Sequence, residues 1–152
     1  MEDLTAELLP TAYYHVVFTL PHELHPLILR NRKELFKLLF DAASKTLLQF
    51  AGDKKYLGAK CSITAILHTW GQQLSFHPHL HCIVSGGGID SDNKWVQAKR
   101  KNDKFLFPVA AMKSVFKGIF LKGLRYLISK NKLKLTGIDF QTIINEAGFK
   151  KW

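Results

Sequence analysis

The sequence predicts an α+β fold in which helices pack on one antiparallel sheet. Three runs are rich in β-branched and aromatic residues, and two long stretches repeat apolar side chains at helical spacing. Only a few residues separate the second and third of the β-type runs. Because brief connections usually join strands that pair, these two runs are expected to be antiparallel neighbours.

The first strand and the first helix are predicted from their compositions and from the proline or glycine that follows each one. Tyr13–Leu20 is rich in β-branched and aromatic residues and is followed by Pro21, so a strand is predicted there. From Pro26 to Ala51 apolar side chains recur on one helical stripe, and Gly52 supplies a C-terminal stop. Residues 1–12 are expected to be a lead-in, because Pro10 ends any helix begun at Leu4.

Two further strands and a hairpin are predicted between residues 60 and 98. Lys60–Trp70 is the second strand, and the third begins at Phe76 and is expected to end at the glycines 86–88. The run Asp90–Asn93 has the residues of a tight turn, with a return strand at Lys94–Ala98.

The remaining elements are predicted to be mostly helical. A second helix enters at Phe105–Pro108 and runs to about Lys130, with a buried stripe from Met112 to Leu127. Lys132–Leu135 is expected to be a short strand or an extended link, and Asp139–Ala147 a last short helix.

The whole chain, 1–152, is expected to be a single domain, incomplete at both ends. No apolar run is long enough for a membrane span, and the acidic first residues lack the features of a secretory signal, so a cytoplasmic location is expected. Cys61 and Cys82 lie in apolar strand-like contexts and are expected to be reduced core thiols.

The formal net charge of +10 points to a polyanionic partner. The excess lies after the third strand, where the segment from Lys94 to Lys134 has Asp103 as its only acid. Such residues neutralise phosphates, although a solvated face kept for solubility is the alternative. The candidate DNA contacts are Lys99, Arg100, Lys101, Lys104, Lys113, Lys117 and Arg125.

His79 and His81 are the candidate metal ligands. Side chains of a strand alternate between faces, so these two imidazoles share one face. A third ligand is expected from the neighbouring strand. Gln72 is the preferred candidate, because its amide oxygen suits Mg²⁺ or Mn²⁺, and Gln73, His68 and His77 are alternatives.

Three sequence blocks carry a resemblance to a known family. They are Tyr14–Pro21, Leu67–Gln72 and His77–Gly88. In this order they resemble the rolling-circle, two-tyrosine insertion-sequence transposases of the HUH (His-hydrophobe-His) endonuclease superfamily. The resemblance extends from about Leu8 to Trp152.

The resemblance implies a ferredoxin-like or RRM-like sheet that carries His79 and His81. These would hold Mg²⁺ or Mn²⁺ against a scissile phosphate of single-stranded DNA at a transposon end. A tyrosine would then attack, leaving a 5′ phosphotyrosine link and a free 3′ hydroxyl. The implied function is DNA transposition by nicking and rejoining.

The sequence departs from the family at the nucleophile. No Tyr-Leu-x-x-Tyr block occurs, and the cysteine-rich zinc segment is also absent from this sequence. Tyr126 is the one tyrosine on a later helix, but its spacing from Ile119 favours core packing over catalysis. We therefore expect a fragment that binds metal and DNA and lacks the catalytic tyrosine.

Two alternatives remain open on the sequence. One is a non-catalytic, RRM-like module that binds nucleic acid without any effect of metal. The other is a cupin-like metal enzyme acting on a small molecule, against which stand the charge and the two long helices.

Overall fold

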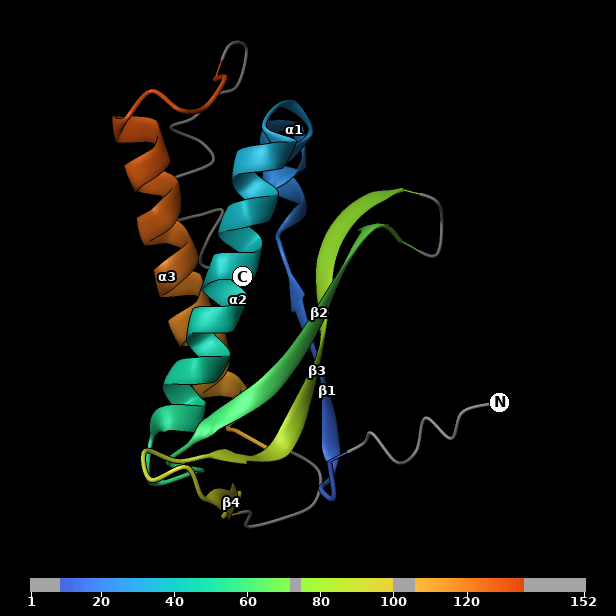
Figure 1. The fold of residues 1–152 in the computed structure, drawn as a ribbon. Helices are drawn as coiled ribbons and strands as arrows, with labels where there is room; N and C mark the ends of the chain where they lie inside the picture. The colour runs from blue at the N-terminus through green and yellow to red at the C-terminus, as the bar shows by residue number, and fades with distance from the viewer. Residues whose placement is uncertain (1–8, 72–74, 100–105, 136–152) are drawn as a thin grey trace.

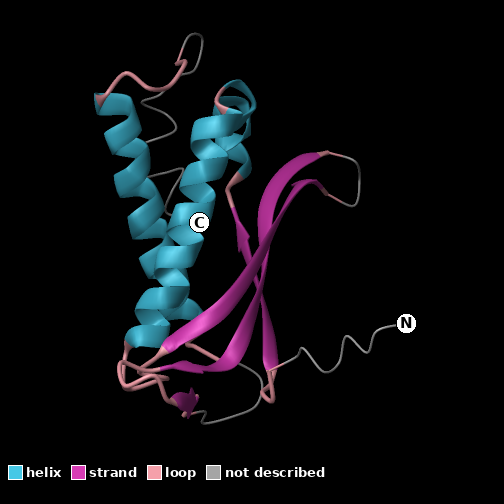
Figure 2. Ribbon diagram, viewed as in Figure 1, coloured by secondary structure: helices cyan, strands magenta, loops and turns pink. Residues whose placement is uncertain are grey.

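A layer of helices covers one face of a twisted antiparallel sheet (Figures 1 and 2). The computed structural model describes residues 9–71, 75–99 and 106–135. The elements in chain order are β1 (Tyr13–Thr19), the 3₁₀ turn η2 (His22–Leu24), α1 (His25–Arg30), α2 (Arg32–Gly52), β2 (Lys60–Trp70), β3 (Phe76–Ile89), β4 (Trp95–Gln97) and α3 (Val109–Ser129). The predicted α+β class is confirmed.

β3 is the central strand of the sheet. It pairs antiparallel with β1 on one side and with β2 on the other, and its end pairs with the short strand β4. β1 and β2 therefore run parallel to each other with β3 between them, and α1 and α2 form the crossover that joins them. This is the split β-α-β arrangement of ferredoxin-like folds, as the resemblance implied.

The two faces of the sheet differ in what covers them. Leu80, Cys82 and Val84 of β3 point toward the helices and are buried. Phe18 of β1 also belongs to this face, and its ring lies 4.7 Å from that of Phe116 of α3. In the described part of the chain α2 and α3 lie on this same side of the sheet, so the opposite face is open (Figure 1).

The single helix expected over 26–51 is divided into α1 and α2 at Asn31. Asn31 has φ −134° and ψ 42°, outside the helical region, and its side chain is buried. The side-chain amide donates to the carbonyl oxygens of Leu27 at 2.9 Å and Lys134 at 3.1 Å, and its oxygen accepts from the backbone N–H of Lys134 at 2.7 Å. Tertiary hydrogen bonds thus hold the break, which helical periodicity alone could not reveal.

The prediction that three glycines end the third strand is wrong. β3 continues through Gly86, Gly87 and Gly88 to Ile89. A Cβ atom at Gly88 would collide with the backbone of Lys60 on β2, and one at Gly87 with the ring of Trp95 on β4. The glycines therefore allow neighbouring strands to approach closely and keep the strand paired.

The chain after α3 forms no strand within 132–135, so this segment is a link rather than a strand. Leu133 is buried against the core. The expected last helix, at 139–147, lies outside the described residues. Both cysteines are buried free thiols, as predicted, and none of the helices in the described ranges is long and apolar enough to cross a membrane.

Candidate metal site on the open face of the sheet

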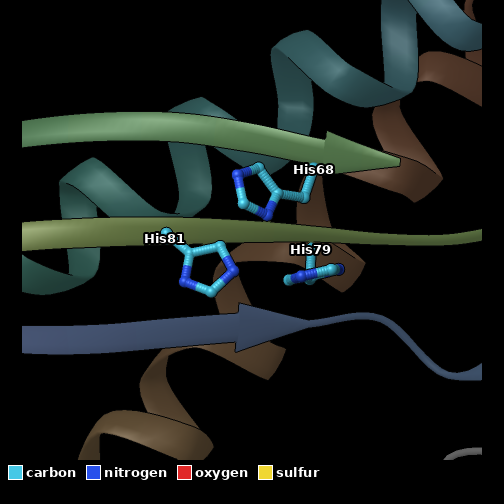
Figure 3. A group of neighbouring side chains, drawn as sticks. All are labelled: His68, His79 and His81. Atoms are coloured by element: carbon cyan, nitrogen blue, oxygen red, sulfur yellow. The ribbon is translucent and has the colours of Figure 1, made fainter. Parts of the chain in front are cut away.

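Strands β2 and β3 bring three histidines together on the open face. His68 of β2 is the cross-strand partner of His79, and Ile66 is the partner of His81. One nitrogen of each imidazole of His68, His79 and His81 lies within 4.8 Å of the corresponding nitrogens of the other two. Figure 3 shows the three rings gathered beside the two strands. This trio is called the histidine cluster below.

Hydrogen bonds leave the Nε2 atoms of His79 and His81 available as ligands. Nδ1 of His79 donates to the carbonyl oxygen of His77 at 2.6 Å. Nδ1 of His81 lies 2.7 Å from Nε2 of His15 on β1, and these two rings are stacked. A neutral histidine that donates the N–H of one ring nitrogen in a hydrogen bond presents the lone pair of the other nitrogen to a metal.

The electrostatics of the cluster favour a neutral imidazole at His81. Desolvation, followed by the nearby rings of His68, His79 and His15, holds the pKa of His81 below its usual value. A metal ligand must be neutral, and metal binding releases any proton that the nitrogen carries. At neutral pH His81 is therefore in the form that binds a cation.

The donor set fits a divalent metal ion. Imidazole nitrogens suit borderline divalent ions, and three protein ligands with further positions open to water or substrate are typical of catalytic metal sites. His68 is exposed, and His79 and His81 are partly exposed. The histidine cluster thus has both the ligands and the solvent access that a catalytic ion requires.

The structure brings together the two ligands preferred from sequence and one of the alternatives. His79 and His81 lie side by side, as strand alternation predicts, and His68 completes the cluster. The ring centroid of His77 lies 5.3 Å from that of His79, but His77 is outside the cluster. Gln72, the preferred third ligand, lies outside the described residues.

His15 is the residue of the site for which the sequence showed no role. It contacts His81 because β1 pairs with β3 and places His15 opposite Ile83. Ile83 is two residues from His81 and lies on the same face of β3. Strand alternation places His15 on the same face of β1 as Tyr13 and Val17, which the sequence alone indicates. The register that sets His15 beside His81 depends on how β1 pairs with β3, and the sequence does not give it.

Tyr126 is placed differently from the sequence expectation. Its side chain is 55% exposed rather than packed in the core. It lies in a groove of about 800 Å³ between α2 and α3, with Leu38 and Ile119 among the lining residues. The buried positions of α3 are Met112, Phe116, Phe120 and Leu124, and two residues beyond Leu124 the helix surface turns toward solvent.

The cations predicted to contact DNA fall into three groups. Lys99 follows β4, where its Nζ donates to the carbonyl oxygen of Lys54 at 3.3 Å. Lys113, Lys117 and Arg125 lie on α3, in the helix layer rather than on the open face. Arg100, Lys101 and Lys104 lie outside the described residues. None of the four described candidates is therefore placed beside the histidine cluster.

Comparison with known proteins assigns the chain to a family. Residues 62–152 match the Y2_Tnp family, described as "Putative transposase". The chain belongs to this transposase family. The transposase resemblance of the three sequence blocks is thus confirmed.

Two curated relatives are themselves transposases by name. The chain is 39% identical over 153 residues to "Putative transposase y4qJ" of Sinorhizobium fredii (strain NBRC 101917 / NGR234), covering 100% of this chain and 37% of the relative. It is 41% identical over 83 residues to the transposase for insertion sequence element IS801 of Pseudomonas savastanoi pv. phaseolicola, covering 55% of this chain and 19% of the relative. The chain therefore spans well under half of each relative.

The Y2_Tnp chain shares its fold with a conjugative relaxase. A metal-bound structure of the relaxase TrwC in complex with oriT DNA matches with a TM-score of 0.57 and 18% identity, over 74% of this chain and 43% of the relaxase chain. A TrwC complex with a 27-mer DNA that contains the recognition hairpin and cleavage site matches with the same TM-score and 20% identity, over 74% of this chain and 44% of that chain. The likeness supports the predicted HUH-type fold.

Proposed function

We propose that the chain is the metal-binding, single-stranded-DNA-binding core of a transposase that nicks and rejoins DNA through a phosphotyrosine intermediate. The observation that carries this proposal is the histidine cluster on the open face of the sheet, in a chain of a transposase family. The DNA-bound relaxase structures of similar fold support the same choice of partner.

The residues of the cluster would act by holding and orienting the reacting phosphate. His68, His79 and His81 would be the ligands, and a bound divalent ion would polarise the phosphoryl oxygens and stabilise the charge of the transition state. In the step itself a tyrosine oxygen forms a bond to phosphorus and the bond from phosphorus to the 3′ oxygen breaks. The proton lost by the tyrosine ends on the 3′ hydroxyl.

We propose that the nucleophile is supplied by a part of the full-length transposase other than the described residues. Tyr126 lies between the helices, on the side of the sheet away from the cluster. Tyr13 shares the open face, but it pairs with Ser85 at the far end of β1, whereas His81 pairs with Val17. Incubation of this chain with Mn²⁺ and single-stranded DNA should therefore give no covalent protein–DNA band. A strong band that disappears in Tyr126→Phe would contradict this assignment.

Of the two ions expected from sequence, Mn²⁺ fits the cluster better. Mg²⁺ prefers oxygen ligands, whereas three imidazole nitrogens favour a softer ion. Gln72 remains our candidate for a further oxygen ligand. Comparison of Mn²⁺ affinity in Gln72→Ala with that in the parent chain tests its contribution.

The open face offers a surface on which unpaired bases can lie. Its exposed apolar side chains include Val17 of β1, Ile83 of β3, and Ile66 and Trp70 of β2. Trp70, two residues after His68, is 60% exposed. Stacking of a base on an aromatic ring stabilises single-strand binding, so we propose that the DNA crosses this face beside the cluster.

The first test is metal-dependent stabilisation. At a Mn²⁺ concentration of about 100 times Kd, binding should stabilise the chain by about 2.7 kcal/mol, which raises Tm by about 5–10 °C for a domain of this size. The double variant His79→Ala/His81→Ala should lose this shift, and His68→Ala should lose most of it. Differential scanning fluorimetry measures all three.

His22→Ala is the matched control, because His22 is exposed and its contact is with the neighbouring Glu23. It should retain the full shift. An unchanged Mn²⁺-dependent rise in Tm in the double variant would contradict the assignment of the metal site. Single-strand binding that is insensitive to Mn²⁺ in every variant would favour the non-catalytic RRM-like module, which the exposed apolar face also suits.

A further inference from the structure

A fourth histidine, outside the cluster and on β1, contacts one of the cluster's candidate ligands. Nε2 of His15 on β1 lies 2.7 Å from Nδ1 of His81 on β3. The two rings are nearly parallel, with an interplanar angle of 8° and a centroid distance of 4.9 Å. The contact joins the outer strand β1 to the cluster, which otherwise comes from β2 and β3 alone.

The chemistry of imidazole assigns the direction of this hydrogen bond once a metal is bound. When Nε2 of His81 gives its lone pair to a cation, the neutral ring carries its proton on Nδ1. Nδ1 of His81 must then donate, and Nε2 of His15 must accept. His15 is consequently neutral, with its own proton on Nδ1.

His79 shows the same arrangement with a different acceptor. Its Nδ1 donates to the carbonyl oxygen of His77 at 2.6 Å. A backbone carbonyl cannot be removed by substitution, whereas the acceptor of His81 is a side chain. The cluster therefore has one ligand oriented by the backbone and one oriented by His15.

We propose that His15 is a positioning residue of the metal site, which orients the ring of His81 and selects the tautomer that presents Nε2 to the ion. The proposal rests on the proposed metal site. Acceptors of this kind fix the ring of a metal-bound histidine and raise its basicity, and their loss typically lowers metal affinity 10–100-fold.

Two variants separate the hydrogen bond from ring packing. His15→Phe keeps an aromatic ring against His81 but removes the acceptor, and it should lower Mn²⁺ affinity 10–100-fold, measured by titration with EPR detection of free Mn²⁺. His15→Gln restores an acceptor oxygen and should recover most of the affinity. Because the contact is exposed, the Tm of both variants without metal should stay close to that of the parent chain.

A spectroscopic readout tests the tautomers directly. In the Zn²⁺-loaded chain labelled with ¹⁵N-histidine, long-range ¹H–¹⁵N correlation should show His81 and His15 each protonated on Nδ1. An Nε2-protonated His81, or Mn²⁺ affinity within twofold of the parent chain in His15→Phe, would overturn the role of His15. If the His15 tests fail but His79→Ala loses Mn²⁺ binding, the role of His15 is refuted and the metal site is retained. Unchanged Mn²⁺ binding in His79→Ala refutes the metal site itself.

Discussion

At the scale of single residues, Cys61 and Cys82 illustrate how burial governs chemistry. Both thiols are buried, and desolvation raises the pKa of each to about 11. The reactive thiolate is therefore scarce at pH 8, and we expect almost no reaction of the native chain with an aromatic disulfide reagent. In denaturant both thiols should react fully, as absorbance of the released chromophore would show. Rapid reaction of either thiol in the folded chain would contradict the burial.

The histidine cluster shows which residues a sequence can and cannot identify. His79 and His81 follow from strand alternation, since two residues apart on one strand always share a face. The third member depends on the register between strands. His68 pairs with His79, and an irregularity in the register follows between His68 and Trp70. Neither feature is encoded in local spacing, so the sequence could not choose among His68, Gln72 and His77.

At the scale of secondary-structure elements, the break between α1 and α2 depends on Asn31. Asn31→Ala removes three hydrogen bonds and leaves the N–H of Lys134 without its acceptor. Buried groups left unpaired cost about 1–3 kcal/mol, so Tm should fall by about 2–12 °C. Urea denaturation followed by circular dichroism measures the loss of stability.

Gln49→Ala is the matched control for Asn31, because it truncates an exposed polar side chain on α2. Its effect should stay within about 0.5 kcal/mol of the parent chain. If Asn31→Ala were equally mild, the break would not depend on these hydrogen bonds.

Element positions were more predictable than element ends. Apolar periodicity located both long helices, and β-branched runs located three of the four described strands within a few residues. The break at Asn31 and the extension of β3 through its glycines both depend on contacts with distant segments, at Lys134 and at Lys60. Local propensity predicts where elements lie, but it contains no information on contacts between segments that are distant in the sequence.

At the scale of the whole molecule, charge and chemistry lie in different layers. The histidine cluster is on the open face, whereas Lys113, Lys117 and Arg125 are on α3 in the layer of helices that packs against the other face. The net charge of +10 predicted a polyanionic partner, but it could not show that these cations are separated from the site. A DNA strand that contacts both must extend from the open face around an edge of the sheet.

This separation predicts that two variants will depend differently on DNA length. Trp70→Ala should weaken binding of a short single strand to the open face by about 1–3 kcal/mol, the usual contribution of one stacked base. The triple variant Lys113→Ala/Lys117→Ala/Arg125→Ala should leave the short strand unaffected. It should weaken binding of a strand several times longer, and it should lower the dependence of log K on log salt concentration by about 0.7 for each phosphate that the variant no longer neutralises.

Fluorescence anisotropy at several salt concentrations measures both effects, and Leu48→Ala, which truncates another exposed apolar side chain but on α2, is the control for Trp70. The two layers bind DNA independently if each variant affects its own class of DNA. An equal decrease in affinity for short and long strands in the triple variant would place the bound strand on α3 instead of the open face. In that case the histidine cluster could not reach the phosphate, because the sheet lies between it and the helices.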